Sequence, residues 1–324
     1  MTGAFLTALF FAGNAVCARR AALHYGSTTG NFLRLLLAAG LLGAWAHAVG
    51  QGVGGGAFGW FFVGGAVGFG LGGLTMFHAL PLIGSNLSML IVQCGSAVAA
   101  ALAEWVWLGA RLSPAQLGLA ALILAGVVLG LVTIDHGGIR RSRPTITKPE
   151  IVGRGLPTPP MSPPFKLGIV LAIVSACAQG GGAVISRKAF MVLRAQGFFM
   201  DSATSAYQRA LGGLTVGLLA LAVVRWWPAA ERKAPAETTA VPAMALSPWI
   251  WVVLNTLLGP VLGVTCYQWA LRTTQAGIVL PIVATAPLLT VPIARALEHS
   301  RPPARYWIGA VLAVVGAAGL AVVK

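Results

Sequence analysis

The chain has 324 residues, of which 57% are hydrophobic and only 9% are charged, with a mean hydropathy of +0.83. A soluble domain contains about 45 to 50% apolar and about 25% charged residues, so this composition excludes a soluble domain as well as a disordered chain. The formal net charge of +15 raises the question of nucleic-acid binding. The lysines and arginines lie in short clusters between apolar runs, however, which favours basic anchors at a lipid bilayer and no nucleic-acid partner. The sequence therefore predicts an integral membrane protein.

Ten apolar runs divide the chain, and each is about as long as the roughly 20 residues that a helix needs to cross a bilayer. The runs are apolar on all faces and lack the alternation of barrel strands. The tryptophans fall near the ends of the runs, where amphipathic rings favour the membrane interface. We therefore expect an all-α protein with about ten transmembrane helices. The expected spans are residues 2–23, 31–49, 58–79, 84–107, 114–134, 167–188, 203–226, 248–271, 276–297 and 303–323.

The two halves of the chain are similar in sequence. Residues 14–21, NAVCARRA, line up with residues 182–189, GAVISRKA. Arg34 at the start of the second span matches Arg209 at the start of the seventh. Each half carries five spans, and because five is an odd number the second half must enter the membrane from the opposite side. The sequence therefore predicts two inverted five-helix repeats, an arrangement typical of secondary transporters whose solute binds near the midplane.

The repeats are expected at residues 1–134 and 167–324, with a linker at 135–166 between them. The linker contains seven prolines and six lysines or arginines, so we expect a solvated tether. Binding of anionic lipids or of a partner is the alternative role for its positive charge. Two complete halves in one chain make a monomer the expected functional state.

A family resemblance extends over both halves. Residues 77–130, from FHALPLIGSN to LILAGVVLG, resemble the end of an EamA domain of the drug/metabolite transporter superfamily. Residues 268–319 repeat the pattern, with Trp307-Ile308-Gly309-Ala310 and the glycines that follow. Ala110 departs from it, because the family usually has an acid there, in a leucine-glycine-glutamate element.

The resemblance implies a multi-pass transporter of the cell (inner) membrane that exports or exchanges a small metabolite, such as an amino acid or a drug-like compound. It also implies a cavity lined by the first, third, fourth, sixth, eighth and ninth spans, and cytoplasmic termini. The lysines and arginines favour the opposite orientation, because most of them lie on the side that follows the odd-numbered spans. Both orientations therefore stay open.

Uncharged polar side chains near span centres are the candidate substrate-binding residues, because a hydrogen-bonding group in hydrocarbon needs a partner helix or a hydrated cavity. An interhelical hydrogen bond is the alternative role for each. The candidates are Asn14, Gln93, Ser96, Gln179, Asn255 and Thr285. The resemblance favours Asn14, Gln93 and Gln179, which fall on spans that it places around the cavity.

Four further residues are candidates for a gate or for ion coupling: His78, Glu104, Tyr267 and Gln268. Glu104 and Glu298 lie near span ends, and no acid lies at a midplane. This argues against a built-in carboxylate proton site, which requires a desolvated acid in the cavity. We expect Glu298 to pair with its helix neighbours Arg295 and Arg301.

The matched arginines, Arg34 and Arg209, are expected to extend to the lipid headgroups. Attraction of an anionic solute to each cavity mouth is the alternative. With no cation expected deep in the cavity, the sequence predicts a neutral or zwitterionic solute.

Other functions find little support in the sequence. Residues 68–73 match G-x-G-x-x-G, but they lie inside an apolar span with no strand before them, so no nucleotide site is predicted. The four cysteines lie singly within spans, which predicts no metal or other cofactor. No histidine lies near a span centre and no acids are paired, so an enzyme is not expected. The alternatives to transport are a membrane scaffold or lipid scramblase and, less favoured, an intramembrane enzyme.

Overall fold

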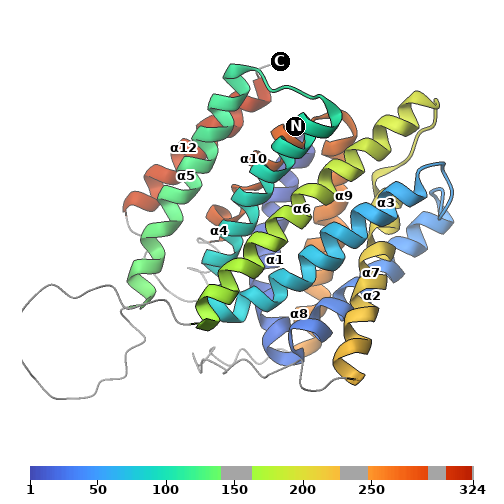
Figure 1. Ribbon diagram of the computed structural model, residues 1–324, viewed down its shortest axis with the longest axis horizontal. Helices are drawn as coiled ribbons and strands as arrows, with labels where there is room; N and C mark the ends of the chain where they lie inside the picture. Colours follow the sequence, from blue (N-terminus) through green and yellow to red (C-terminus); the bar gives the residue numbers. More distant parts are fainter. Residues whose placement is uncertain (140–162, 227–246, 291–303, 323–324) are drawn as a thin grey trace, which may run out of the picture.

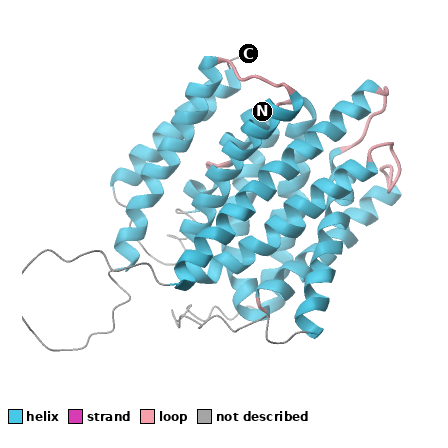
Figure 2. Ribbon diagram, viewed as in Figure 1, coloured by secondary structure: helices cyan, strands magenta, loops and turns pink. Residues whose placement is uncertain are grey.

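The computed structural model describes residues 1–139, 163–226, 247–290 and 304–322, which form helices joined by short loops (Figures 1 and 2). No strand occurs within these ranges, so the predicted all-α class is confirmed for them. The helices are α1 (Thr2–Tyr25), α2 (Ser27–Ala48), α3 (Phe58–Gly65), α4 (Gly72–Leu108), α5 (Pro114–Ile139), α6 (Pro163–Ala195), α7 (Ser202–Trp226), α8 (Pro248–Thr256), α9 (Leu262–Thr273), α10 (Ala276–Val283) and α12 (Ala304–Val322). Two π-helical segments, η1 (Ala66–Leu71) and η3 (Leu257–Val261), connect α3 to α4 and α8 to α9.

Six stretches of the described chain are helical, long and apolar enough to cross a membrane: Ser27–Ala48, Phe58–Ile83, Leu87–Leu108, Phe165–Ala195, Ser202–Trp226 and Pro248–Thr273. Three shorter apolar helices accompany them: Pro114–Leu129, Ala276–Thr290 and Trp307–Leu320. Helix α1 has 24 residues but is not among the six. The helical spans of a membrane protein are therefore present, and the count of ten stays a prediction.

Helix α4 turns back on itself. Gly72 lies beside Gln179 of α6, and Gly95 lies beside Ala176 of the same helix. In a straight helix the two glycines would be about 34 Å apart, so they could not both lie beside residues of α6 that are only three positions apart. The chain therefore reverses direction between them, in the stretch that contains Pro81. The expected spans 58–79 and 84–107 correspond to the two limbs on either side of this reversal.

Prolines explain the irregular backbone in the second half. Pro260 lies inside η3, where its missing N–H favours a local change from α-helical to π-helical hydrogen bonding. A turn at residues 284–285 interrupts the helical stretch Ala276–Thr290, just before Pro287. The helical backbone is thus irregular at Pro260 and just before Pro287.

Helices of the first half pack mainly on helices of the second half. Helix α1 packs against α8 and α9, and α6 packs against α3 and α4. Helix α2 pairs with α7, and α5 pairs with α12. The α5–α12 pair lies at one side of the molecule, on the left in Figure 1, and the remaining helices form the central bundle. The centre of this bundle is therefore a junction between the two halves.

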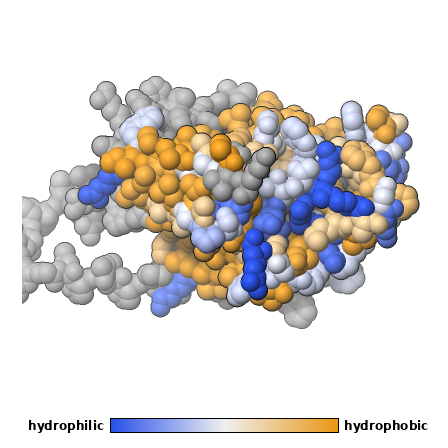
Figure 3. Space-filling model, turned by 90° about the horizontal axis from the view of Figure 1, so that it is seen from above, coloured by the Kyte–Doolittle hydropathy of each residue, from blue (hydrophilic) through white to orange (hydrophobic). Residues whose placement is uncertain are grey.

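Apolar side chains cover much of the outer surface of the described chain. Viewed from above, orange hydrophobic atoms occupy both flanks, and blue hydrophilic atoms gather in a band between them (Figure 3). Large exposed apolar residues include Trp105, Val106, Trp226 and Val314. Such a surface needs a lipid environment, which agrees with the predicted membrane protein.

Two glycines of α5 provide a matched test of the α5–α12 pairing. A Cβ at Gly126 would meet the carbonyl oxygen of Gly309 and the amide nitrogen of Ala313, whereas a Cβ at Gly118 would meet nothing within 4 Å. We expect Gly126→Ala to lower the midpoint of thermal unfolding in detergent by at least about 3 °C, because the helices must move apart. Gly118→Ala should leave it unchanged or raise it, since alanine favours helix by about 1 kcal/mol. Equal midpoints for the two variants would contradict this packing.

Candidate solute-binding cavity

A cavity of about 60 Å³ lies inside the central bundle, and a second of about 40 Å³ adjoins it. We call the two together the central cavity. By volume each has room for a few water molecules. Both are lined by Phe11, Gly68, Phe69, Gln93, Gln179 and Val264. The first is also lined by Asn14, Arg34, Leu35, Gly73, Met76, Met89, Val92, Gly259 and Pro260, and the second by Ser96, Arg209, Tyr267, Leu280 and Val283.

The irregular helical segments supply part of the lining. Gly68 and Phe69 come from η1, and Gly259 and Pro260 come from η3. π-Helical turns are rare and occur frequently at functional sites. A Cβ at Gly259 would collide with the amide group of Asn14, so glycine leaves the space that this polar side chain occupies.

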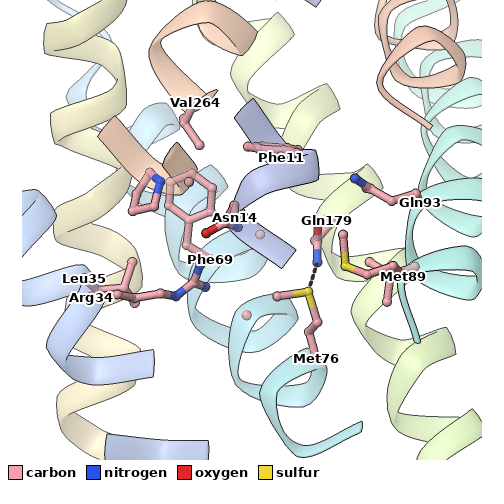
Figure 4. Close-up of a pocket in the computed structure, with 15 residues that line it drawn as sticks. Phe11, Asn14, Arg34, Leu35, Phe69, Met76, Met89, Gln93, Gln179 and Val264 are labelled. Atoms are coloured by element: carbon pink, nitrogen blue, oxygen red, sulfur yellow. Dashed lines mark hydrogen bonds between the residues drawn. The ribbon is translucent and has the colours of Figure 1, made fainter. Parts of the chain in front are cut away.

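Four of the predicted substrate-binding residues line the central cavity. Asn14 on α1 contributes a buried Oδ1 that has no hydrogen-bond partner. Gln179 on α6 donates from Nε2 to Ser175 Oγ at 3.0 Å, and the same Nε2 lies 3.8 Å from the sulfur of Met76 (Figure 4). Gln93 borders both parts of the cavity, and Ser96 borders the smaller part.

The other two predicted substrate-binding residues are buried but do not belong to the cavity lining. Asn255 on α8 is fully buried, and neither of its amide atoms has a partner. The hydroxyl of Thr285 donates to the carbonyl of Ile282 on the preceding turn, at 2.7 Å. Neither residue therefore lines the cavity, and neither shows the interhelical hydrogen bond that was the alternative role.

The four gate or coupling candidates lie in different surroundings. Tyr267 lines the smaller part of the cavity, whereas the neighbouring Gln268 is fully buried with both amide atoms unpartnered. His78 lies 3.4 Å from the hydroxyl of Thr28 and 2.8 Å from the carbonyl of Leu74, outside the cavity lining. Only Tyr267 thus faces the central cavity.

Glu104, the fourth candidate, caps a helix. Its two oxygens accept hydrogen bonds from the backbone N–H groups of Ala276 and Gly277, each at 2.8 Å. These are the first two residues of α10, where unpaired N–H groups and the helix dipole favour a negative charge. Glu104 is 2% exposed, so the bonds are shielded from water. The carboxylate therefore joins the second limb of α4 to α10. The expected pairing of Glu298 with Arg295 and Arg301 lies outside the described residues.

The expectation that Arg34 and Arg209 extend to the headgroups is wrong. Arg34 is 7% exposed and Arg209 is 2% exposed, and both line the central cavity. Helix α2 begins at Ser27 instead of residue 31, which places Arg34 about 10 Å along the helix axis from its start. The expectation that no cation lies deep in the cavity is therefore wrong as well.

Arg34 is held by its own helix and by an aromatic ring. Its Nε and Nη2 donate to Oδ1 of Asn31 at 3.0 and 2.8 Å. The guanidinium lies 4.8 Å from the ring centre of Phe77, a cation–π distance. Figure 4 shows the side chain extending from α2 toward the region of Phe69 and Asn14.

Arg209 occupies a corresponding position on α7. Its Nη1 donates to the carbonyl of Gly182 at 2.8 Å and to the hydroxyl of Ser186. The guanidinium lies 4.7 Å from the ring centre of Phe69, and its buried Nε has no partner. Among the described residues neither arginine forms a salt bridge. The cavity thus contains two positive charges, and the described residues that contact them are neutral.

Helix capping by Glu104 can be tested against a second carboxylate. Asp201 caps α7 with Oδ1 alone, which accepts from the N–H groups of Ala203 and Thr204. Glu104→Gln replaces one accepting oxygen with an NH₂ group facing an N–H donor, so we expect a loss of about 1 to 3 kcal/mol in stability. Asp201→Asn should cost less than about 1 kcal/mol, because asparagine caps as well as aspartate. Denaturant unfolding in detergent measures both, and an equal loss would contradict the two-oxygen cap.

Comparison with known proteins places the chain in a family. The family model of the EamA-like transporter family matches residues 1–132 and 166–322. No curated protein matches the chain. One solved structure, described as "Crystal structure of protein", superposes with a TM-score of 0.65 at 19% identity, covering 98% of this chain and 96% of the other. That likeness supports the fold alone. The two matched segments include both halves and leave out most of the linker, and the chain belongs to the EamA-like transporter family.

Proposed function

We propose that the chain is a secondary transporter that exports or exchanges a small metabolite through the central cavity. The observation that carries the proposal is a buried cavity lined by polar side chains from both halves, among them Asn14, Gln93, Gln179 and Arg209. Unpartnered polar atoms in such surroundings are costly unless water or a solute satisfies them. A hydrated solute site satisfies them, whereas a scaffold has no need of one.

Alternating access between two inverted repeats is the proposed mechanism. The helix contacts support it because they are symmetric under exchange of the halves. The packing of α1 on α8 corresponds to that of α6 on α3, and the packing of α1 on α10 corresponds to that of α6 on α4. The pairs α2–α7 and α5–α12 each join a helix of the first half to its counterpart in the second, so exchange of the halves leaves them unchanged. Rocking of such halves about a shared site exposes the site to each side in turn.

The Glu104 cap is the proposed gate contact at one end of the cavity. It joins α4 of the first half to α10 of the second through two hydrogen bonds. On the adjoining helix of the second half, Arg187 donates to the carbonyls of Leu271 and Arg272, just before α10. Separation of the halves at this end must break the bonds of Glu104, so their strength sets part of the cost of opening. We place the transporter in the cell membrane and expect a monomer to suffice.

Transport by the purified, reconstituted full chain tests the proposal. Proteoliposomes are loaded with a mixed pool of amino acids and small organic acids, and efflux is measured with and without a proton gradient. We expect Asn14→Ala and Gln93→Ala to lower the efflux of the transported solute by roughly five- to tenfold, the effect of about one lost hydrogen bond. Efflux should persist without the gradient, since no described residue of the cavity lining is acidic.

The matched control is Thr215→Ala, because Thr215 on α7 is exposed and its hydroxyl bonds only to the carbonyl of Leu211. This variant should transport like the wild type. Wild-type efflux from both cavity variants would contradict the placing of the site. Efflux of no member of the pool would contradict the transporter itself.

A further inference from the structure

The charges of the central cavity are unbalanced. Arg34 and Arg209 both contribute guanidinium groups, and among the described residues that line the cavity none is acidic. Transfer of an uncompensated charge into apolar surroundings is so costly that buried charges are normally paired. Guanidinium groups retain their charge under almost any conditions, so loss of a proton does not relieve this cost. An anion that enters from outside the chain would relieve it.

Each guanidinium keeps donors free for such an anion. An arginine has five N–H donors. Arg34 uses Nε and Nη2 on Asn31, which leaves Nη1 without a partner among the described residues. Arg209 uses Nη1 on Gly182 and Ser186, which leaves Nε and Nη2 without one. The aromatic rings and neutral groups thus orient the two cations without consuming their capacity to bind an oxyanion.

Both guanidinium groups approach the same helical limb. A Cβ at Gly73 would meet Nη2 of Arg34, and a Cβ at Gly68 would meet Nη2 of Arg209. Arg34 borders the larger part of the central cavity and Arg209 borders the smaller part, and Gly68 and Phe69 of this limb border both parts. Glycine at both positions leaves the space in which the guanidinium groups lie.

The rest of the lining restricts the body of the solute. Phe11, Leu35, Met76, Met89 and Val92 provide apolar walls, while Asn14 offers a free amide oxygen. The two parts of the cavity, of about 60 and 40 Å³, are each smaller than the roughly 150 Å³ of a cavity that binds benzene. A solute that fits this volume is a compact molecule of a few carbon atoms.

We propose that the transported solute is a compact organic anion whose oxyanionic group binds between Arg34 of the first half and Arg209 of the second. The inference rests on the proposed transport function and replaces the expected neutral or zwitterionic solute with one of net negative charge. A carboxylate and a phosphate share the recognised chemistry. An additional ammonium group weakens binding, because two guanidinium groups repel it and no described acid in the lining attracts it.

Three solutes of nearly equal size separate charge from shape. Lactate is anionic, lactamide is its neutral amide, and alanine is a zwitterion. Their fluxes, together with that of inorganic phosphate, are measured in proteoliposomes of the full-length chain, with the flux of protein-free liposomes subtracted. We expect lactate or phosphate to exceed lactamide by at least about tenfold, and lactate to exceed alanine, since a hydrogen bond to a charged group is worth about that factor. Phosphate above lactate would identify a phosphate solute, and the reverse a carboxylate.

Variants of α7 test whether the preference for an anionic solute depends on Arg209. Arg209→Gln should reduce lactate flux at least about tenfold and leave lactamide flux within about twofold, whereas Arg209→Lys should retain more lactate flux. Arg225→Gln is the control, because Arg225 is exposed at the end of the same helix, and it should behave like the wild type. The comparison of wild-type fluxes needs no variant, so it decides the matter even if Arg209→Gln fails to fold.

Each outcome has a distinct meaning. Flux of lactamide or alanine equal to or above that of lactate and phosphate would overturn the anionic solute while leaving transport intact. Unchanged lactate flux in a folded Arg209→Gln variant would overturn the assigned site. Flux of none of the four compounds, and of no member of the wider metabolite pool, would overturn the proposed transporter and with it this inference.

Discussion

Two buried arginines with no acidic partner among the described residues impose the main constraint on the interior of this protein. A guanidinium group in a bilayer core is costly, and the side chains of Arg34 and Arg209 are both almost fully buried. Asn31, a backbone carbonyl and two phenylalanine rings stabilise them in part. Neutral groups cannot compensate the two charges, however. Water or an anion in the cavity would compensate them, and the proposed transport of an anion rests on this requirement.

The backbone around the cavity fits that requirement. Glycines stand where a methyl group would displace a polar side chain, as at Gly259 beside Asn14 and at Gly73 beside Arg34. The π-helical segments η1 and η3 place such glycines at the junction of the halves. Helices α5 and α12 pack closely on each other at one side and take no part in the lining. The chain thus separates helices that build the site from helices that support it.

The sequence predicts the helices of the site and several of its polar residues, but it does not predict the positive charge of the cavity. Composition and run length predict the helical membrane protein, and polar residues in apolar runs pointed to Asn14, Gln93 and Gln179, which line the cavity. Arg34 was misplaced because hydropathy locates a helix end only within a few residues, and one extra turn separates an interfacial arginine from a buried one. The cap formed by Glu104 joins residues 172 positions apart, a contact that no local pattern encodes.

The most direct measurement is a distance between a bound anion and the two arginines. Solid-state NMR on proteoliposomes can detect coupling between the carboxylate carbon of ¹³C-labelled lactate and arginine side-chain nitrogens labelled with ¹⁵N. An anion held between Arg34 and Arg209 predicts contacts of about 4 Å to guanidinium nitrogens, lost in part in each of Arg34→Lys and Arg209→Lys. Lactate that is bound but shows no such contact, or contacts that survive both substitutions, would contradict an anion site at these two residues.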